Sequence, residues 1–271
     1  MTLLSDQATA VRALVDSADP GAVWAVGGLE GPQAGSEAGH PADAAFDVGG
    51  LTAVLALWPA LGSLVDEGAL QLHTPLTVYG EPAAENAPAG TTAHHLLTHP
   101  GGTTALTRLA EHLSGGPLAD LAATRVWRPL GMTGTHFADG TLRAPLADLV
   151  RFLRHLLAPA DPADPADPVN PAGISRAWTA ESLRIRTGEL TPARGLLWQP
   201  APHGVWTHHA PQDGGPALWI SPRHHRWAVL LPASDAGALR HAFREAAFAP
   251  TAGGRGRTDI AALPSGPAPL A

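Results

Sequence analysis

The stretch FDVGGLTAVLALWPALGSLVDEG, residues 46–68, decides how this chain folds. Residues 48–65 carry no charge, and a run of that length approaches the shortest segment that spans a membrane. Three glycines, a proline and a threonine interrupt it, so we expect a buried core helix over residues 50–67 that ends at Gly68. Because Pro59 lacks a backbone N–H, it removes one helical hydrogen bond and predicts a kink in the turn before it.

Hydrophobic periodicity and turn residues divide the rest of the chain into short elements. The N-terminal segment has apolar residues at helical spacing and ends at Asp19-Pro20-Gly21, whereas residues 29–44 are rich in Gly, Pro and Ala and indicate a loop. The repeated Asp-Pro run at 161–171 indicates an extended, exposed linker. We expect further helices at 91–102, 104–114, 117–127, 145–157 and 235–248, and strands within 21–28, 194–200, 204–210, 216–222 and 226–233.

The order of these elements predicts the fold class. A helix and a strand precede a helical block, and several strands and a closing helix follow it. This order favours an α/β (α+β) protein with an antiparallel sheet flanked by helices and an all-helical region. We expect residues 1–249 to form one domain, with the helical region, about 68–190, inserted between the sheet-forming parts. Residues 250–271 have almost nothing to pack and are expected to be a disordered tail.

Composition excludes several classes of function. The net charge of −7 and the lack of a basic stripe argue against nucleic acid as a partner, since clustered basic residues are needed to neutralise phosphates. The chain has no cysteine, which excludes disulfides, thiol catalysis and cysteine-ligated zinc, and all 17 basic residues are arginines. The N-terminus has neither a basic start nor a continuous apolar segment, so we expect no secretory signal, no membrane partner and a soluble, cytoplasmic protein. Heavy use of Ala, Pro, Gly and Arg suggests a GC-rich, bacterial genome.

Four stretches carry a pattern seen in other proteins. They are residues 46–80, the His-Leu-Leu-Thr-His-x-x-Gly stretch within 91–102, the Pro-Leu-Gly-Met-x-x-Thr stretch within 126–137, and residues 218–234. Together they resemble the serine β-lactamase and penicillin-binding-protein-like family, in its class C-like, esterase-like branch, over roughly residues 20–248. The resemblance implies a β-lactamase/transpeptidase-like fold, with the active site between an antiparallel sheet and an all-helical region.

The resemblance also implies a mechanism. A serine attacks an activated carbonyl, and a lysine one helical turn later helps to deprotonate that serine. A tyrosine of a Tyr-x-Asn motif relays the proton, a Lys/His-x-Gly strand supports the substrate, and backbone N–H groups form an oxyanion hole.

This sequence departs from that mechanism at the nucleophile and its base. The serine position falls on Gly50 and the lysine position on Ala53, and no shift of frame helps because the chain contains no lysine. Removing one member of a coupled catalytic unit lowers the rate by about 10⁴–10⁶-fold. We therefore assign no catalytic residue.

The second and third motifs are also incomplete. The interval expected to hold Tyr-x-Asn is shortened to Thr103-Thr104, and Tyr79 matches a family tyrosine that precedes a structural turn. In the third motif His209 is present without its glycine, although Gly214 and Gly215 follow closely. All three motifs of the mechanism that the resemblance implies are therefore incomplete in this sequence.

Other hydroxyl groups offer weaker routes to nucleophilic chemistry. Ser63 lies beyond Pro59 without a neighbouring base, and Ser36 lies in a Gly/Ala-rich segment, so both are expected to be structural. A Thr52–His209 pair is conceivable, but Thr52 is two residues past the nucleophile position and points about 200° around the helix from it.

Fourteen histidines raise the question of a metal site. His95 and His99 are four residues apart, a spacing that suits two ligands on one helix face, and the pairs 208–209 and 224–225 could add a third. No His-Glu-x-x-His arrangement is present, and adjacent residues on a strand point to opposite faces, so we expect no metal and no other cofactor. The tryptophans are expected to pack the core rather than to form a ligand cage: Trp58, Trp127, Trp198, Trp206, Trp219 and Trp227.

These observations favour a catalytically degenerate β-lactamase-like protein, a pseudoenzyme that keeps a cleft for a small molecule or a protein partner. One alternative is a hydrolase of the same family with an unconventional nucleophile or a histidine-activated water, and another is a structural interaction module with a filled cleft. The free N–H groups at the helix start are expected to hold an anion or a carbonyl oxygen. The residues expected to line the cleft are Gly50, Leu51, Thr52, Ala53, His99, His209, Gly214 and Gly215.

Overall fold

The computed structural model describes residues 5–36, 44–158, 173–188, 192–209, 214–234 and 237–249. The expected linker at 161–171 and the expected tail at 250–271 lie outside these residues. The helices are α1 (Ser5–Ala18), α2 (Trp58–Asp66), α3 (Glu81–Ala84), α4 (Ala93–Thr98), α5 (Thr103–Ser114), α6 (Leu118–Ala122), α7 (Leu146–Leu157), α8 (Arg176–Ser182) and α9 (Gly237–Phe248). The strands are β1 (Val23–Gly28), β2 (Gly31–Gly35), β3 (Ala45–Asp47), β4 (His136–Ala138), β5 (Thr141–Pro145), β6 (Gln199–Ala201), β7 (Val205–His209), β8 (Ala217–Ser221) and β9 (Arg226–Leu231).

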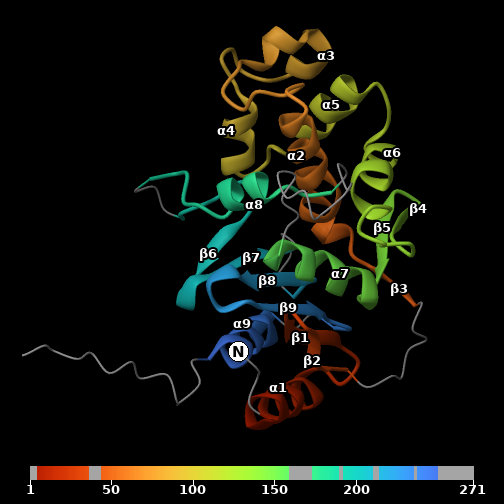
Figure 1. The fold of residues 1–271 in the computed structure, drawn as a ribbon, viewed down its shortest axis with the longest axis vertical. Coiled ribbons are helices and arrows are strands. Elements are labelled where there is room, and N and C mark those ends of the chain that lie inside the picture. The colour runs from red at the N-terminus through yellow and green to blue at the C-terminus, as the bar shows by residue number, and fades with distance from the viewer. Residues whose placement is uncertain are drawn as a thin grey trace, which may run out of the picture.

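The main sheet has the strand order β2-β1-β9-β8-β7-β6, and all neighbouring strands are antiparallel. Figure 1 shows α1 and α9 on one side of this sheet and the block of helices α2–α6 on the other, with α7 packed against β1, β8 and β9. This arrangement confirms the predicted fold class. The helical region also contains β4 and β5, which pair with β3 in a second, three-stranded sheet.

The central strands are buried on both faces, which explains why they appear in the sequence as continuous apolar runs. On β1, Trp24 and Val26 belong to an outer core with α1 and α9, whereas Val23 and Ala25 belong to an inner core with the helical region. The sheet therefore separates two hydrophobic cores.

The prediction of a loop over residues 29–44 is wrong for its first part, where β2 forms an edge strand. A Cβ on Gly27 would lie 2.3 Å from the carbonyl oxygen of Gly31, so only glycine allows the two strands to approach at the bulge between them. Pro32 is tolerated because it lies on an edge strand. The glycines and proline that suggested a loop are therefore also suited to an irregular edge strand.

The helix expected over residues 50–67 forms as a 3₁₀ turn at Gly49–Leu51, a π-helical stretch at Ala53–Leu57 and then α2. The turn before Pro59, where a kink was predicted, is this π-helical stretch. Pro59 cannot donate to the carbonyl of Leu55, and that oxygen instead accepts a hydrogen bond of 2.9 Å from the indole Nε1 of Trp127.

A tryptophan cluster joins α2 to the segments that follow the helical block. The ring of Trp58 lies 6.0 Å from that of Trp178, 5.9 Å from Trp198 and 6.5 Å from Phe152. The indole Nε1 of Trp58 donates to Ser182 at 2.8 Å, and that of Trp178 donates to the carbonyl of Trp58 at 3.1 Å. Trp58, Trp127, Trp198, Trp219 and Trp227 are buried as predicted, whereas Trp206 is half-buried.

Gly62 on α2 faces this cluster, and we predict that Gly62→Ala destabilises the protein. Alanine favours a helix interior over glycine by about 1 kcal/mol, but a Cβ here would lie 2.5 Å from Cδ1 of Trp178. We expect the overpacking to dominate, with a net loss of about 1–3 kcal/mol in urea unfolding. Gly116→Ala is the matched control, because a Cβ there meets nothing within 4 Å, and equal stability of the two variants would contradict this packing.

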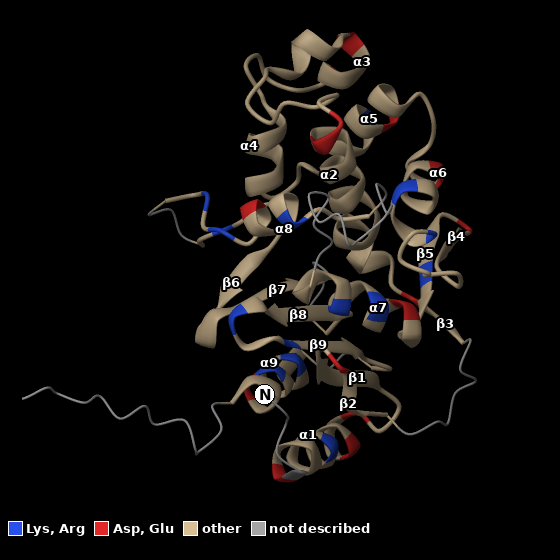
Figure 2. Cartoon of the chain, viewed as in Figure 1, with Lys and Arg blue, Asp and Glu red and all other residues tan. Residues whose placement is uncertain are grey.

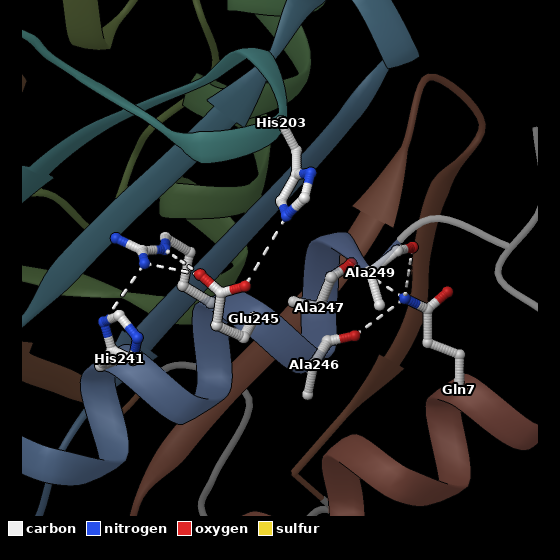
Figure 3. A network of polar contacts seen from close by, with 8 residues as sticks. Gln7, His203, His241, Glu245, Ala246, Ala247 and Ala249 are labelled. Carbon is white, nitrogen blue, oxygen red and sulfur yellow. Dashed lines mark hydrogen bonds and ion pairs between the residues drawn. The ribbon is translucent and has the colours of Figure 1, made fainter.

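Polar contacts join the two terminal helices on the outer face of the sheet (Figure 3). The amide of Gln7 donates to the carbonyl of Ala246 at 2.8 Å, near the end of α9. Glu245 accepts from Arg244 and lies 3.7 Å from Nε2 of His203, in the turn before β7. These contacts are structural and fix α1 and α9 against the sheet.

Candidate functional site

Three backbone N–H groups at the start of the α2 segment are already bonded, so the expectation of free N–H groups is wrong for Gly49, Leu51 and Thr52 and stays a prediction for Gly50. The N–H of Gly49 donates to the Asp47 carboxylate at 2.9 Å, that of Leu51 to the carbonyl of Val48 at 2.8 Å, and that of Thr52 to the carbonyl of Gly49. The Asp47 carboxylate also places negative charge where an anion was expected.

The side chains of this turn differ in accessibility. Gly50, Thr52 and Ala53 are half-buried, whereas Leu51 is 0% exposed and belongs to the inner core, so the expectation that Leu51 lines a cleft is wrong. The Thr52 hydroxyl donates to the carbonyl of Gly49 at 2.8 Å. That bond removes Thr52 as a free nucleophile.

The 3₁₀ turn contacts β5 and β7, so the structure brings Gly50 beside the strand on which the third motif was placed. The register of that strand corrects the choice of histidine. His209 pairs with Ala217 of the outer core, whereas His208 pairs with Leu218 of the inner core. Because cross-strand partners share a face, His208 and not His209 points toward the helical region.

His208 is held in a neutral state. Its Nδ1–H donates to the carbonyl of Leu197 at 2.7 Å, and its ring meets the Trp198 indole edge-on at 6.3 Å. Burial lowers the pKa of His208 to about 4, with the hydrogen bond to Leu197 opposing and the nearby His209 adding to the shift. A neutral imidazole whose Nδ1–H is bound to a carbonyl fixes structure and supplies no positive charge to a substrate.

This shift predicts acid sensitivity of the fold. The unfolded chain takes up a proton on His208 below its ordinary pKa of about 6.5, whereas the folded chain does so only near pH 4. The stabilisation by neutral His208 is therefore complete above pH 6.5 and is lost as the pH falls toward 4. Because the side chain is only half-buried, this stabilisation is at most about 2.5 kcal/mol between pH 7.5 and pH 4.5.

Urea unfolding at both pH values checks this prediction. His208→Gln cannot titrate and should lose less stability than the wild type over the same range, by at most about 2.5 kcal/mol. His136→Gln, at an exposed position, should behave like the wild type. An unchanged pH dependence in His208→Gln would show that His208 is not buried in its neutral form.

Leu197 links the sheet to the helical region through its backbone. Its N–H donates to the carbonyl of Leu97 on α4 at 2.8 Å, while its carbonyl accepts from His208 on β7. Leu197 has φ +63°, an uncommon value for a residue with a branched side chain. The strained backbone indicates that the segment before β6 is held firmly between the two parts.

The loop that carries the second motif in the family is absent from the described structure. α4 ends at Thr98 and α5 begins at Thr103, directly after Gly102, whose added Cβ would lie 2.5 Å from the Leu96 carbonyl oxygen. The interval in which the resemblance places Tyr-x-Asn is therefore a tight turn between α4 and α5. The Tyr79 hydroxyl instead bonds to the backbone N–H and carbonyl of Gln71, which supports its structural interpretation.

His99, Gly214 and Gly215 were expected to line the cleft. His99 is exposed just beyond α4, and its Nδ1 lies 3.0 Å from the carbonyl of His95. Gly214 is buried with φ +83° and Gly215 is half-buried, both shortly before β8. Their assignment to a cleft stays a prediction.

The metal interpretation gains no support. The imidazoles of His95 and His99 stack at 4.1 Å instead of converging on a common point. Among the described residues, no group of three or more His, Cys, Asp or Glu side chains has an arrangement suited to a metal ion.

The two serines considered as nucleophiles are bound to backbone. Ser63 donates to the carbonyl of Ala60 at 2.8 Å within its own helix, and Ser36 contacts the N–H and carbonyl of Trp24 beside β1. Neither serine contacts a base in these hydrogen bonds, which supports a structural role for both.

Solved structures identify the fold. No protein-family model and no curated protein matches the sequence. A β-lactamase from Mycobacterium bovis is 20% identical and superposes with a TM-score of 0.63, covering 88% of this chain and 99% of that one. A putative β-lactamase from Bacteroides dorei is 14% identical with a TM-score of 0.68, covering 90% and 99%. The chain has the serine β-lactamase fold.

A class C β-lactamase from Rhodobacter sphaeroides agrees with this assignment at 14% identity and a TM-score of 0.63, covering 88% of this chain and 98% of that one. A penicillin-binding protein homologue from Pyrococcus abyssi does so at 12% identity and a TM-score of 0.62, covering 86% and 74%. The resemblance read from the four sequence stretches is thereby confirmed at the level of the fold. In the described part of the chain, none of the helices has the length and apolar character needed to cross a membrane.

Proposed function

We propose that the protein is a catalytically degenerate member of the β-lactamase fold that binds a ligand or partner and does not hydrolyse it. One observation carries the proposal: the helix start that bears a serine and a lysine in the family bears Gly50 and Ala53 here, in a chain without any lysine. The bonded Thr52 hydroxyl and the neutral, bonded His208 support it, because neither is available as an obvious substitute.

The second candidate function is a structural interaction module whose cleft is filled. The Leu197 bridge between α4 and β7 favours it, because this backbone occupies the boundary between the helical region and the sheet. Figure 2 shows acidic and basic residues interspersed over many elements, which supports a small molecule or a protein, and not nucleic acid, as the partner.

A ligand panel in a thermal-shift assay separates the two functions. A ligand present at 100 times its Kd stabilises the folded state by about 2.7 kcal/mol, which raises the melting temperature measurably. We expect β-lactams or acyl-D-amino-acid peptides to do so without being consumed. A panel that never moves the melting temperature would support the filled cleft, and turnover of any member would support the hydrolase.

A further inference from the structure

A cavity lies away from the Gly50 turn, at the end of the sheet where β7 begins. Its volume is about 650 Å³, within the range of small-molecule sites. Its walls come from α7, α8 and three strand turns, and Gly204 and Trp206 line it at the opposite end of β7 from His209. None of the residues expected to line the cleft beside Gly50 contributes to this cavity, although Pro222, Arg223 and His225 lie within residues 218–234, one of the four stretches of the resemblance.

The body of the cavity is apolar. Leu156 and Leu157 close it from α7, Leu183 from the end of α8 and Trp206 from β7. Leu29, in the turn between β1 and β2, is one of the few large apolar side chains that the described surface exposes, at 37%. Apolar surface that stays exposed beside a cavity indicates a place where an apolar ligand gains by burial.

The charged groups of the lining are all basic. Arg176 comes from α8, and Arg223 and His225 come from the turn between β8 and β9. Among the described residues that line the cavity there is no aspartate or glutamate. Glu181, the nearby acid of α8, is paired with Arg184 and Arg186. The cavity therefore combines an apolar body with positive charge and no described carboxylate to oppose an anion.

We propose that this cavity binds a small amphiphile with an apolar chain and one carboxylate. The chain would pack against Leu156, Leu183 and Trp206, and the carboxylate would pair with Arg223, which is exposed and free to reorient. The inference does not rest on the proposed function, because it uses a different part of the sheet and none of the residues expected to line the cleft beside Gly50.

Calorimetric titration of the full chain with decanoate below its micelle concentration tests the proposal, with decanol as the neutral analogue. We expect saturable binding of one decanoate and at least tenfold weaker binding of decanol. Arg223→Gln should weaken decanoate binding about tenfold and leave decanol unchanged. Arg128→Gln, an exposed arginine outside the cavity, should bind both like the wild type.

Ala180→Trp is the steric test, because Ala180 lines the cavity and is exposed, so a larger side chain there fills space without displacing core residues. It should abolish binding while keeping the melting temperature. If the Ala180→Trp variant fails to fold, the effect of Arg223→Gln on decanoate binding relative to decanol binding tests the proposal alone. The proposal is overturned by a lack of saturable decanoate binding, by equal affinity for decanol, or by binding only to anionic lipid vesicles.

Discussion

Replacing Trp58 with alanine should lower the free energy of unfolding by about 4 kcal/mol, the upper part of the range for large buried aromatic residues. Trp58 is fully buried and contacts Trp178, Trp198 and Phe152, so its removal opens a cavity where α2, α7, α8 and the segment before β6 meet. It also leaves the Ser182 hydroxyl without its indole donor. Urea unfolding followed by far-UV circular dichroism measures the loss.

Trp58→Phe is the matched control for this experiment. It keeps an aromatic ring against Trp178 and Trp198 but removes the hydrogen bond to Ser182, so we expect a loss of about 1–2 kcal/mol. A loss below 1 kcal/mol for Trp58→Ala would mean that the cluster is not packed as described.

Asp148→Ala should lower the free energy of unfolding by about 3 kcal/mol. The carboxylate is 1% exposed and accepts from the N–H of Gly134 and the hydroxyl of Thr135, both at 2.9 Å, and from Arg151 at 2.6 Å. Alanine leaves the two uncharged donors buried without an acceptor, and unsatisfied buried groups are more destabilising than a lost bond in water.

Arg151→Gln separates the buried bonds from the ion pair. The Arg151 side chain is 49% exposed and can be solvated without its partner, so we expect a loss below about 1 kcal/mol. Thermal unfolding of both variants at pH 7 provides the comparison. If Asp148→Ala and Arg151→Gln lose similar amounts of stability, the ion pair, and not the bonds to Gly134 and Thr135, accounts for the stabilisation by Asp148.

The elements with strong periodicity could be predicted from the sequence, and the short, irregular ones could not. The α2 segment and strands β8 and β9 were found because each has a continuous apolar run with clear turn signals, and β7 was found from the turn signals around its shorter apolar start. β2 was missed because its glycines and proline suit an edge with a bulge as well as a loop, and β3–β5 were missed because strands of three to five residues carry too little alternation.

The candidate site shows a different limit. The sequence placed a histidine on the strand beside Gly50 but chose His209, one residue from the side chain that faces the helical region. A shift of one residue reverses the face of every side chain on a strand, and only the pairing with β8 fixes it. Likewise, the bonds that occupy Thr52 and the N–H of Gly49 depend on local backbone geometry that residue types do not reveal.

We propose that this chain keeps the fold without the chemistry of the family it resembles. The helix start still lies beside the strand of the third motif, as in an enzyme, but the loop of the second motif is reduced to a turn and the side chains at the reactive positions are Gly50 and Ala53. A helix start without a nucleophile cannot form a covalent intermediate. If the protein is catalytically degenerate, a β-lactam or an activated phosphonate should therefore acylate or phosphonylate none of its residues.

Intact-mass measurement after incubation with a fluorescent penicillin and with a fluorophosphonate tests that claim most directly. We predict an unmodified mass with both reagents for the wild type, and also for Gly50→Ser, because a serine without a lysine base remains unactivated. A stoichiometric covalent adduct on any residue of the wild-type protein would contradict the account and establish the chain as a hydrolase with an unconventional nucleophile.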